Sequence, residues 1–508
     1  MRPLRLLSLL LPALLLAVTA RAEDVQAPEI ARPGLQWFNT AAPIPIASLK
    51  GRIVLLDFWT EGCINCMHVI PTLKQIEAAF PDQVAVIGVH SPKFANEQQA
   101  ASVEDAIQRY EIHHPIVHDP KLTIWQAYGI QAWPTLVIVG ADGNVLGEVP
   151  GEPDPDRALK AIGQLVAEAS TAGTLKPETL ALAPEPLPTG RFRFPGKLKP
   201  IPGAEKQWAL ADGGHHQIVV LDDAGHELKR YGSGTAGLID GPAATAAFNR
   251  PQGLVADKDA IFVADTENHA IRRIDLASGA VTTLAGTGQR GRELADAVPG
   301  KTTALASPWD LVETGGQLIF ANAGTHQLGA FDLATGKVRR FAGTGEEALR
   351  AGGAEGAAFA QPSGLSLSTD GKTLYVADSE SSAVRRVSLG KAPEVETLVG
   401  KGLFEFGWIN GKADDARLQH PLGVAVDGND VLVADTYNSA IRTIDLKQRI
   451  VADFDGGAFT CMDPVCKPTR EPAGIVVDGP DRILLVDTGN HRIEEYTPST
   501  KSYHTWAS

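Results

Sequence analysis

The stretch IVLLDFWTEGCINC, Ile53 to Cys66, decides the fold of the first part of the chain. Its first seven residues are apolar apart from Asp57, which predicts a buried strand. From Cys63 onward apolar residues recur at helical spacing, so a helix is predicted to follow directly. Cys63 and Cys66 therefore lie where a strand passes into a helix, one helical turn apart.

The alternation of strand and helix continues to residue 170. Further strands are predicted at 84–89, 135–139 and 144–149, and further helices at 96–110 and 156–169. The tripeptide Ala-Asp-Gly at 141–143 is a hairpin signal between the last two strands. Residues 30–170 are therefore predicted to form an α/β domain, a mixed sheet with helices on both faces.

Cysteines at such a junction allow three interpretations: a redox pair, a structural disulfide or half of a metal site. The chain has only four cysteines, and Cys461 and Cys466 are far from the first two in sequence. A zinc site would need two further Cys or His ligands. A helix N-terminus favours a thiolate, because its N–H groups and dipole stabilise negative charge. The junction therefore favours a redox pair, in which Cys66 resolves a mixed disulfide formed on Cys63.

The segment LLDFWTEGCINC resembles the strand and active-site loop of thioredoxins, and the order of elements is that of the thioredoxin fold. The additional segment between Val89 and Ile116 is similar to the insertion of the TlpA/ResA group of exported thiol–disulfide proteins. The chain departs from thioredoxins at Ile64-Asn65, between the cysteines, and at Gly62, where thioredoxins carry Trp. Because the intervening dipeptide tunes the reduction potential, the direction of electron transfer is not implied.

The resemblance implies roles for four further residues. Asp57 matches the buried acid that relays a proton to the resolving cysteine, and Pro134 matches a cis-proline that presents backbone to a substrate. Trp133 and Glu97 are implied as substrate contacts. Asp57 also fits a satisfied polar residue at a strand end, and Glu97 fits a solvated glutamate at a helix start, so these alternatives stay open.

Beyond a Pro-rich linker at 171–190, the chain repeats itself from residue 191 to 508. The prolines that open five copies, at 251, 308, 362, 421 and 472, are spaced 57, 54, 59 and 51 residues apart. A sixth, degenerate copy comes first. Each copy holds about four short β runs, which predicts an all-β propeller with six blades. The recurring P-x-G entry and V-A-D-T-x-N core resemble NHL repeats.

Two polar positions recur in these copies. One holds an acid in five copies and Asn322 in the third; its acids are Asp212, Asp265, Asp378, Asp435 and Asp487. The other holds a histidine in four copies, at His216, His269, His326 and His491. They fall in equivalent turns around the ring, too far apart to bind one metal ion. We expect such side chains to bind backbone N–H groups.

The chain opens with MRPLRLLSLLLPALLLAVTARAED, which predicts a signal peptide over residues 1–22 with cleavage after Ala22. The alternative is an uncleaved anchor. No later stretch is apolar for long enough to span a membrane, so a periplasmic or secreted protein is expected. The formal charge is −14, and loss of the leader with its three arginines lowers it to −17. Such a chain is expected to repel nucleic acid and anionic lipid.

Cys461 and Cys466 lie in GGAFTCMDPVCKPTREP, between the last two blades. Asp463-Pro464 favours a turn, which would bring the two cysteines close enough for a disulfide. In an oxidising compartment we therefore predict a Cys461–Cys466 disulfide. It is interpreted as a structural staple or as a second redox pair.

These observations favour a thiol–disulfide oxidoreductase whose Cys63–Cys66 disulfide exchanges with a client protein and with an electron-donor or acceptor protein. The propeller would bind the client, and no metal or other cofactor is expected. The alternative is a non-catalytic scaffold or ligand-binding propeller with a vestigial thioredoxin-like domain. A propeller enzyme of the lyase or lactonase kind is disfavoured, because no cluster of metal ligands stands out in the repeats.

Overall fold

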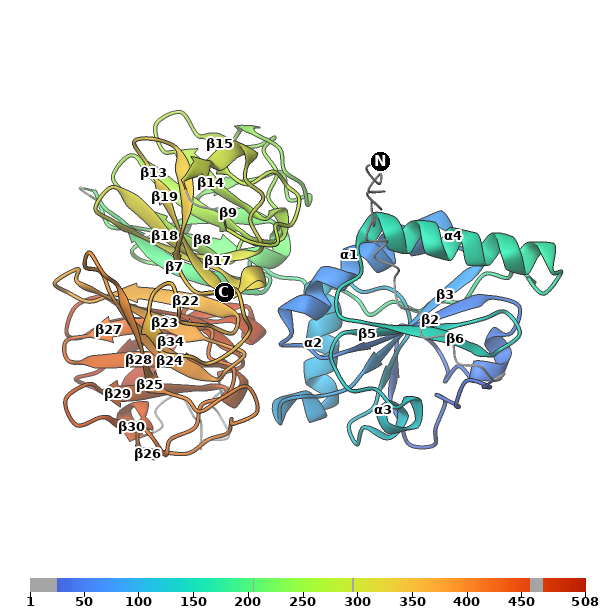
Figure 1. The fold of residues 1–508 in the computed structure, drawn as a ribbon. Coiled ribbons are helices and arrows are strands. Elements are labelled where there is room, and N and C mark those ends of the chain that lie inside the picture. Colours follow the sequence, from blue (N-terminus) through green and yellow to red (C-terminus); the bar gives the residue numbers. More distant parts are fainter. Residues whose placement is uncertain (1–24, 204, 295–296, 457–468) are drawn as a thin grey trace, which may run out of the picture. The chain divides into compact units, whose positions relative to one another are not determined.

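The structure is a computed structural model that describes residues 25–203, 205–294, 297–456 and 469–508. The chain divides into two compact units. The first unit holds the residues up to Glu61, 65–92 and 112–185, and the second holds 62–64, 93–111 and 186–508. The first unit is an α/β fold, and the second contains a β-propeller (Figure 1).

The first unit contains a six-stranded mixed sheet with the strand order β1-β4-β3-β2-β5-β6. Its strands are β1 (Trp37–Phe38), β2 (Ile53–Trp59), β3 (Val84–His90), β4 (Ile116–His118), β5 (Thr135–Val139) and β6 (Val145–Pro150). The strands β2, β3 and β4 are parallel to one another. The strand β5 pairs antiparallel with β2, and β6 pairs antiparallel with β5. This confirms the thioredoxin-like α/β fold. The short strands β1 and β4 were not predicted.

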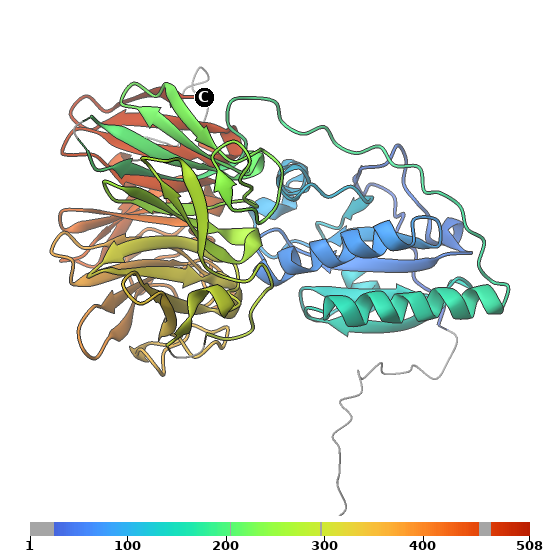
Figure 2. The same ribbon diagram turned by 90° about the horizontal axis from the view of Figure 1, so that it is seen from above.

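Helices cover both faces of this sheet (Figure 2). They are α1 (Ile64–Ala79), α3 (Thr123–Tyr128) and α4 (Pro155–Thr171), whereas α2 (Ala100–Tyr110) belongs to the second unit. On one face Val69 of α1 and Ile162 of α4 join Leu55 in a buried cluster. On the other face Ile124 of α3 and Phe58 join a second cluster. The two clusters follow the alternation of side chains along β2.

The predicted helix at 96–110 is divided in two. A 3-10 turn, Asn96–Gln98, comes first, and α2 begins only at Ala100. The cause is Glu97, whose carboxylate accepts the N–H groups of Lys93 and Phe94 and so closes a turn before the helix. By contrast α4 begins with an ordinary cap, because Asp154 accepts the N–H of Arg157.

The residues that follow α4 carry neither helix nor strand between 174 and 189, where a Pro-rich linker is predicted. Part of this segment lies along the first unit. The N–H of Lys176 donates to the carbonyl of Gly51 at 2.7 Å, and the N–H of Ala183 donates to the carbonyl of Asn39 at 2.8 Å. Further bonds, such as that from the N–H of Glu178 to the carbonyl of Asp82 at 3.2 Å, also tie the segment to the first unit.

The propeller has six blades, which confirms the count predicted from the repeats. Blades one to three are β7 (Pro195–Ile201), β8 (Gln207–Asp212), β9 (Gln217–Asp222) and β10 (Glu227–Tyr231); β12 (Gly253–Ala256), β13 (Ala260–Asp265), β14 (Ala270–Asp275) and β15 (Ala280–Ala285); and β17 (Pro308–Thr314), β18 (Gln317–Asn322), β19 (Gln327–Asp332) and β20 (Lys337–Ala342). Blades four to six are β22 (Pro362–Leu367), β23 (Thr373–Asp378), β24 (Ala383–Ser388) and β25 (Glu394–Val399); β27 (Gly423–Asp427), β28 (Asp430–Asp435), β29 (Ala440–Asp445) and β30 (Ile450–Asp453); and β31 (Pro472–Val477), β32 (Ile483–Asp487), β33 (Arg492–Thr497) and β34 (Ser502–Ala507). Two-residue strands extend the outer edges of blades two to five, at β11 (Gly241–Pro242), β16 (Val298–Pro299), β21 (Gly352–Gly353) and β26 (Gly411–Lys412).

The glycine of the P-x-G motif is required by the close approach of neighbouring blades. A Cβ built on Gly253 would lie 2.6 Å from the Cα of Asp310 in the next blade. A Cβ on Gly423 would lie 2.4 Å from the carbonyl oxygen of Ala473. Any side chain at these two positions would push the blades apart, so the glycines let the innermost strands converge.

One hydrogen bond joins each blade to the next at the recurring histidine position. Backbone N–H groups donate to Nδ1 of a histidine in four blades, from Arg250 to His216, Ser307 to His269, Gln361 to His326 and Phe194 to His491. Serine Oγ replaces the ring nitrogen in two, from His420 to Ser382 and Glu471 to Ser439. The histidines therefore bind backbone N–H groups, as predicted. Among the described residues no group of three or more His, Cys, Asp or Glu could hold a metal ion.

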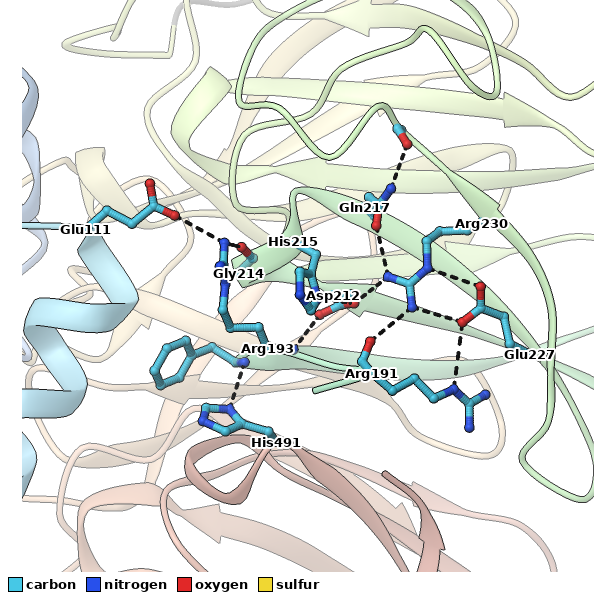
Figure 3. Close-up of polar contacts among 12 residues, drawn as sticks. Glu111, Arg191, Arg193, Asp212, Gly214, His215, Gln217, Glu227, Arg230 and His491 are labelled. Atoms are coloured by element: carbon cyan, nitrogen blue, oxygen red, sulfur yellow. Dashed lines mark hydrogen bonds and ion pairs between the residues drawn. The ribbon is translucent and has the colours of Figure 1, made fainter. Parts of the chain in front are cut away.

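The recurring aspartates hold five of the six blades together, as Asp212 does in blade one (Figure 3). One carboxylate oxygen accepts a backbone N–H and the other accepts from an arginine, in the pairs Asp212–Arg230, Asp265–Arg272, Asp378–Arg385, Asp435–Arg442 and Asp487–Arg492. Blade three lacks this ion pair, since Asn322 and Gly329 stand in the places of the aspartate and the arginine, although Oδ1 of Asn322 still accepts the N–H of Ala306 at 3.0 Å. There the ring of Phe320 occupies the space beside Gly329.

Candidate active site

Cys63 and Cys66 lie at the junction of β2 and α1. The helix begins at Ile64, so Cys63 directly precedes it and Cys66 lies in its first turn. The exposed fraction is 8% for Cys63 and 2% for Cys66, so both are buried and Cys63 is the more accessible. The pairing of the two as a redox disulfide stays a prediction.

Glu97 holds the residue before Cys63. Its carboxylate is fully buried and accepts the N–H of Gly62 at 3.0 Å, besides the N–H groups of Lys93 and Phe94. A buried carboxylate with three backbone donors is not a solvated residue at a helix start. Its direct effect is to fix the dithiol loop, while contact with a substrate stays a prediction.

Asp57 lies near the end of β2 and is 3% exposed. Burial raises the pKa of Asp57 to about 7, and nearby His114 offsets part of this rise. Its Oδ1 has no hydrogen-bond partner among the residues that the structure describes. An acid satisfied at a strand end would have such partners, whereas a carboxyl that gains and loses a proton near neutral pH fits a relay.

His114 is a neighbour of Asp57 that the sequence did not reveal. Gly88 pairs with Asp57 on one side and with Ile116 on the other. His114 lies just before β4, so the register of the sheet brings it close to Asp57. Nδ1 of His114 is 3.4 Å from a carboxylate oxygen of Glu77, whose side chain is 29% exposed. These residues lie far apart in sequence, so only the register of the strands brings them together.

The peptide bond between Trp133 and Pro134 is cis, the isomer expected from the sequence. Pro134 precedes β5, and Thr135 pairs with Phe58 near the end of β2. The proline is therefore at the same edge of the sheet as the loop that leaves β2. Trp133 is half-buried, and its indole N–H donates to the carbonyl of Ser91 at 2.8 Å. Roles in substrate binding stay predictions for both residues.

Two further histidines, also missed from the sequence, lie on the face of the sheet that carries Asp57. His90 ends β3 and His118 ends β4, and the two pair in register beside Trp59. Their Nδ1 atoms are 3.1 Å apart and both residues are buried. Burial, with His118 nearby, lowers the pKa of His90 well below its usual value. A neutral imidazole at this position can share a proton with its neighbour.

The predicted disulfide between Cys461 and Cys466 lies outside the described residues, and so does the predicted signal peptide. Among residues 25–203, 205–294, 297–456 and 469–508, no helix is long and apolar enough to cross a bilayer.

Family models of known proteins match both the α/β fold and the β-propeller of this chain. A family model described as thioredoxin-like matches residues 51–145, which contain both cysteines. A family model of the NHL repeat matches residues 248–274 and 418–444, in blades two and five. Each match falls on the fold that the structure assigns to its part of the chain.

Relatives extend the likeness to the whole chain. NHL repeat-containing protein 2 of Gallus gallus is 38% identical over 521 residues, covering 95% of this chain and 71% of that protein. Protein SUPPRESSOR OF QUENCHING 1, chloroplastic, of Arabidopsis thaliana is 38% identical and covers 90% of this chain and 45% of that protein. Thiol-disulfide oxidoreductase ResA of Halalkalibacterium halodurans is 30% identical over 124 residues, covering 23% of this chain and 68% of that protein. The chain therefore belongs to the family of NHL repeat-containing protein 2, and in it a thioredoxin-like domain precedes an NHL-repeat propeller.

Proposed function

We propose that this protein is a thiol–disulfide oxidoreductase that uses Cys63 and Cys66. The observation that carries this proposal is the position of the two cysteines at the start of α1, which directly follows the strand that holds Asp57. The position of Pro134 at the same edge of the sheet supports it. The matching relatives include a thiol-disulfide oxidoreductase, which is 30% identical over 124 residues.

The reaction proceeds in two exchanges. The Cys63 thiolate attacks a client disulfide, forming a mixed disulfide and releasing one client thiolate, which takes up a proton. The Cys66 thiolate then attacks Cys63, forming the Cys63–Cys66 disulfide and releasing the second client thiol. Two electrons pass to the client, and a dithiol protein restores the cysteines by the reverse exchange. The same steps run backwards oxidise a client dithiol.

Asp57 supplies the proton transfer of the second exchange. Because burial raises the pKa of Asp57 to about 7, its carboxyl can accept the proton of Cys66 and return it at neutral pH. His114, near Asp57, contacts the half-exposed Glu77 and gives this proton a route to solvent. Asp57 is therefore a proton-transfer residue rather than a nucleophile.

Export supports this chemistry, because a protein disulfide persists outside the cytosol. We therefore place the mature protein in a periplasm or outside the cell, with its client and its redox partner, and we keep the Cys461–Cys466 disulfide as part of this proposal. The propeller serves as the surface that binds the client.

The alternative is a scaffold that does not turn over. The burial of Cys63, at 8% exposed, favours it, because an attacking thiol must reach a client sulfur. Cys66→Ala decides between the two, since an oxidoreductase variant without its resolving thiol accumulates client proteins as mixed disulfides on Cys63.

The matched control is the double variant Cys63→Ala with Cys66→Ala, which traps nothing. Cell extracts are quenched with acid, alkylated and compared on non-reducing and reducing gels. Reduction-sensitive adducts that need Cys63 are the expected result. Their absence, together with a Cys63–Cys66 pair that glutathione cannot oxidise, would leave the scaffold as the function.

A further inference from the structure

The six residues that precede the blade prolines share one backbone conformation. Each has a positive φ between 46° and 58°, at Phe194, Arg250, Ser307, Gln361, His420 and Glu471. Residues other than glycine rarely adopt this conformation, and here the N–H bond to the preceding blade holds it in place. We call these six positions the ring. Because the backbone makes the bond between blades, the ring side chains can differ, and they do.

The second unit also contains residues 62–64 and 93–111, which come before the propeller in the chain. Ring side chains contact these two segments. Glu471 forms an ion pair with Arg109, and Arg250 is 3.6 Å from a carboxylate oxygen of Glu111. The centroid of the His420 imidazole lies 5.1 Å from the centroid of the Phe94 phenyl group. These side chains are therefore suited to the segment 93–111 rather than to the propeller repeat.

Glu111 shows how firmly this segment is held. It ends α2 with a positive φ of 50° and meets Arg193 at 3.2 Å (Figure 3), Arg250 at 3.6 Å and His216 at 3.8 Å. His216 and then the two arginines lower the pKa of Glu111 to about 2. Its carboxylate is therefore charged near neutral pH, where it can hold both arginines.

Gln361 is the ring residue that contacts the dithiol loop. Its Oε1 accepts the N–H of Ile64 at 3.0 Å, and the residue is 1% exposed. Its Nε2 has no hydrogen-bond partner within the part of the chain that the structure describes. Ile64 directly follows Cys63 and is the first residue of α1. A side chain of the fourth blade thus binds a backbone group beside the attacking cysteine.

The other side of Cys63 is held as well. Gly62 donates its N–H to Glu97, and a Cβ on Gly62 would lie 3.0 Å from the ring of His420 and 3.1 Å from the ring of Phe94. A tryptophan, which thioredoxins carry here, would clash with both rings. The loop is therefore shaped to lie against ring residues on both sides of Cys63.

The first N–H groups of a helix lack acceptors within the helix and stabilise an anion at its N-terminus. An amide oxygen on the N–H of Ile64 removes one of these donors from the Cys63 thiolate and places partial negative charge beside it. We propose that Gln361 is a positioning residue through which the propeller sets the reactivity of Cys63. This proposal rests on the proposed function, because it concerns the same dithiol.

Two substitutions of Gln361 are expected to shift the apparent pKa of Cys63 in opposite directions. Gln361→Met keeps the length of the side chain but removes the acceptor, so the N–H of Ile64 can stabilise the thiolate. The apparent pKa of Cys63 is then expected to fall by about half a unit, and the protein becomes a stronger oxidant. Gln361→Glu keeps the acceptor but adds a full negative charge, so the apparent pKa is expected to rise by about one unit and the protein becomes a stronger reductant.

The measurement uses the full chain. Cys63 is alkylated with iodoacetamide across a range of pH and identified by mass spectrometry, and the Cys63–Cys66 equilibrium is titrated against glutathione. Arg250→Met is the matched control, because it removes a ring contact to Glu111 but none to Ile64. It is expected to leave both readouts unchanged. A mere loosening of the segments would move all three variants in one direction.

The outcomes separate the two proposals. If the wild-type pair cannot be cycled between dithiol and disulfide, the proposed function fails. If the pair cycles normally but Gln361→Met and Gln361→Glu shift the pKa of Cys63 in the same direction or not at all, only the role of Gln361 is overturned. A shift in Arg250→Met equal to that in Gln361→Met also overturns it.

Discussion

Asp57 in the first unit and Asp378 in the propeller are both buried aspartates, and they differ in their partners. The carboxylate of Asp378 accepts the N–H of Ala360 at 2.7 Å and binds Arg385 at 2.9 Å. Asp57 has one oxygen without a partner among the described residues, and its charged neighbour is a histidine. Burial raises the pKa of Asp57 to about 7 and that of Asp378 to about 6.

The comparison teaches that a raised pKa does not by itself mark an active site. Desolvation is the largest cause in both aspartates, and it acts on any buried carboxyl. Hydrogen bonding separates them, because the propeller acid is paired and recurs in other blades, whereas Asp57 occurs once and is incompletely paired. The propeller acid therefore has a structural role, whereas the incomplete pairing of Asp57 supports the proton transfer that we propose for it.

The strongest test of the scaffold role removes the arginine. Arg385→Ala leaves Asp378 buried without a cation and also removes donors to two backbone carbonyls. We expect the free energy of unfolding of the propeller to fall by about 3–5 kcal/mol. Hydrogen exchange on peptides of β23 and β24 measures it. Arg386→Ala is the control, because that side chain is 40% exposed and its pair with Glu396 contributes at most about 1 kcal/mol.

Blade three offers the converse experiment. Asn322 occupies the aspartate position there, and Gly329 replaces the arginine. Asn322→Asp therefore creates a buried carboxylate without a cation. We expect it to lower the free energy of unfolding of the propeller by about 2–3 kcal/mol at pH 8 and by less at pH 5. Equal stability of Asn322→Asp and the wild type at pH 8 would show that the arginine is not what makes a buried acid tolerable.

Asp57→Asn tests the other side of the comparison. The pKa of Asp57 is raised from 3.8 to about 7, so the folded protein holds this proton more tightly than the unfolded chain does. The stability that the protonated Asp57 carboxyl gives the folded protein is fully present below pH 3.8 and is lost as the pH rises through 7. The neutral asparagine avoids this loss, so we expect the variant to be more stable by about 2–4 kcal/mol at pH 8 and equal at pH 4.

Hydrogen exchange on peptides of β2 reports this difference for the first unit alone. Asp156→Asn, which makes the same change from carboxyl to amide at an exposed position in the first turn of α4, serves as the control. An Asp57→Asn protein that is less stable than the wild type at pH 8 would mean that the carboxylate has partners in the folded state, and the relay would lose its basis.

The sequence predicted the features that recur or that follow one another closely. Five proline-headed copies and one degenerate copy predict six blades, and four histidines at one repeat position indicate a common structural task. The cysteines and Asp57 lie on one strand–helix junction, so their proximity needs no tertiary information. The cis bond before Pro134 was predicted by resemblance alone.

What the sequence did not reveal depends on contacts between distant segments. His114 lies near Asp57 because β2, β3 and β4 pair in register. Gln361 occupies a repeat position whose side chain differs in every blade, so no periodicity marks it. The assignment of residues 93–111 to the second unit likewise follows from contacts such as that of Glu111 with Arg250.

The smallest expected effect on stability concerns the histidine hydrogen bond that joins the last blade of the propeller to the first. His491 Nδ1 accepts the N–H of Phe194 at 3.1 Å and joins blade six to blade one (Figure 3). Only a neutral ring nitrogen can accept. Burial, aided first by Arg109, lowers the pKa of His491 from 6.5 to about 4. The stability from this bond is therefore present above pH 6.5 and is lost as the pH falls through 4.

His491→Ala removes the acceptor, and we expect it to lower the free energy of unfolding of the propeller by about 1–2 kcal/mol at pH 7. His491→Ser keeps an oxygen where Ser382 and Ser439 already accept in two other blades, so it should recover part of that loss. Because serine does not titrate, the serine variant should also show a weaker loss of stability between pH 6.5 and 4 than the wild type. Hydrogen exchange of peptides that contain Phe194 provides the measurement. If the alanine and serine variants are equally destabilised at pH 7, the histidine acts by packing, and the hydrogen bond is not what closes the ring.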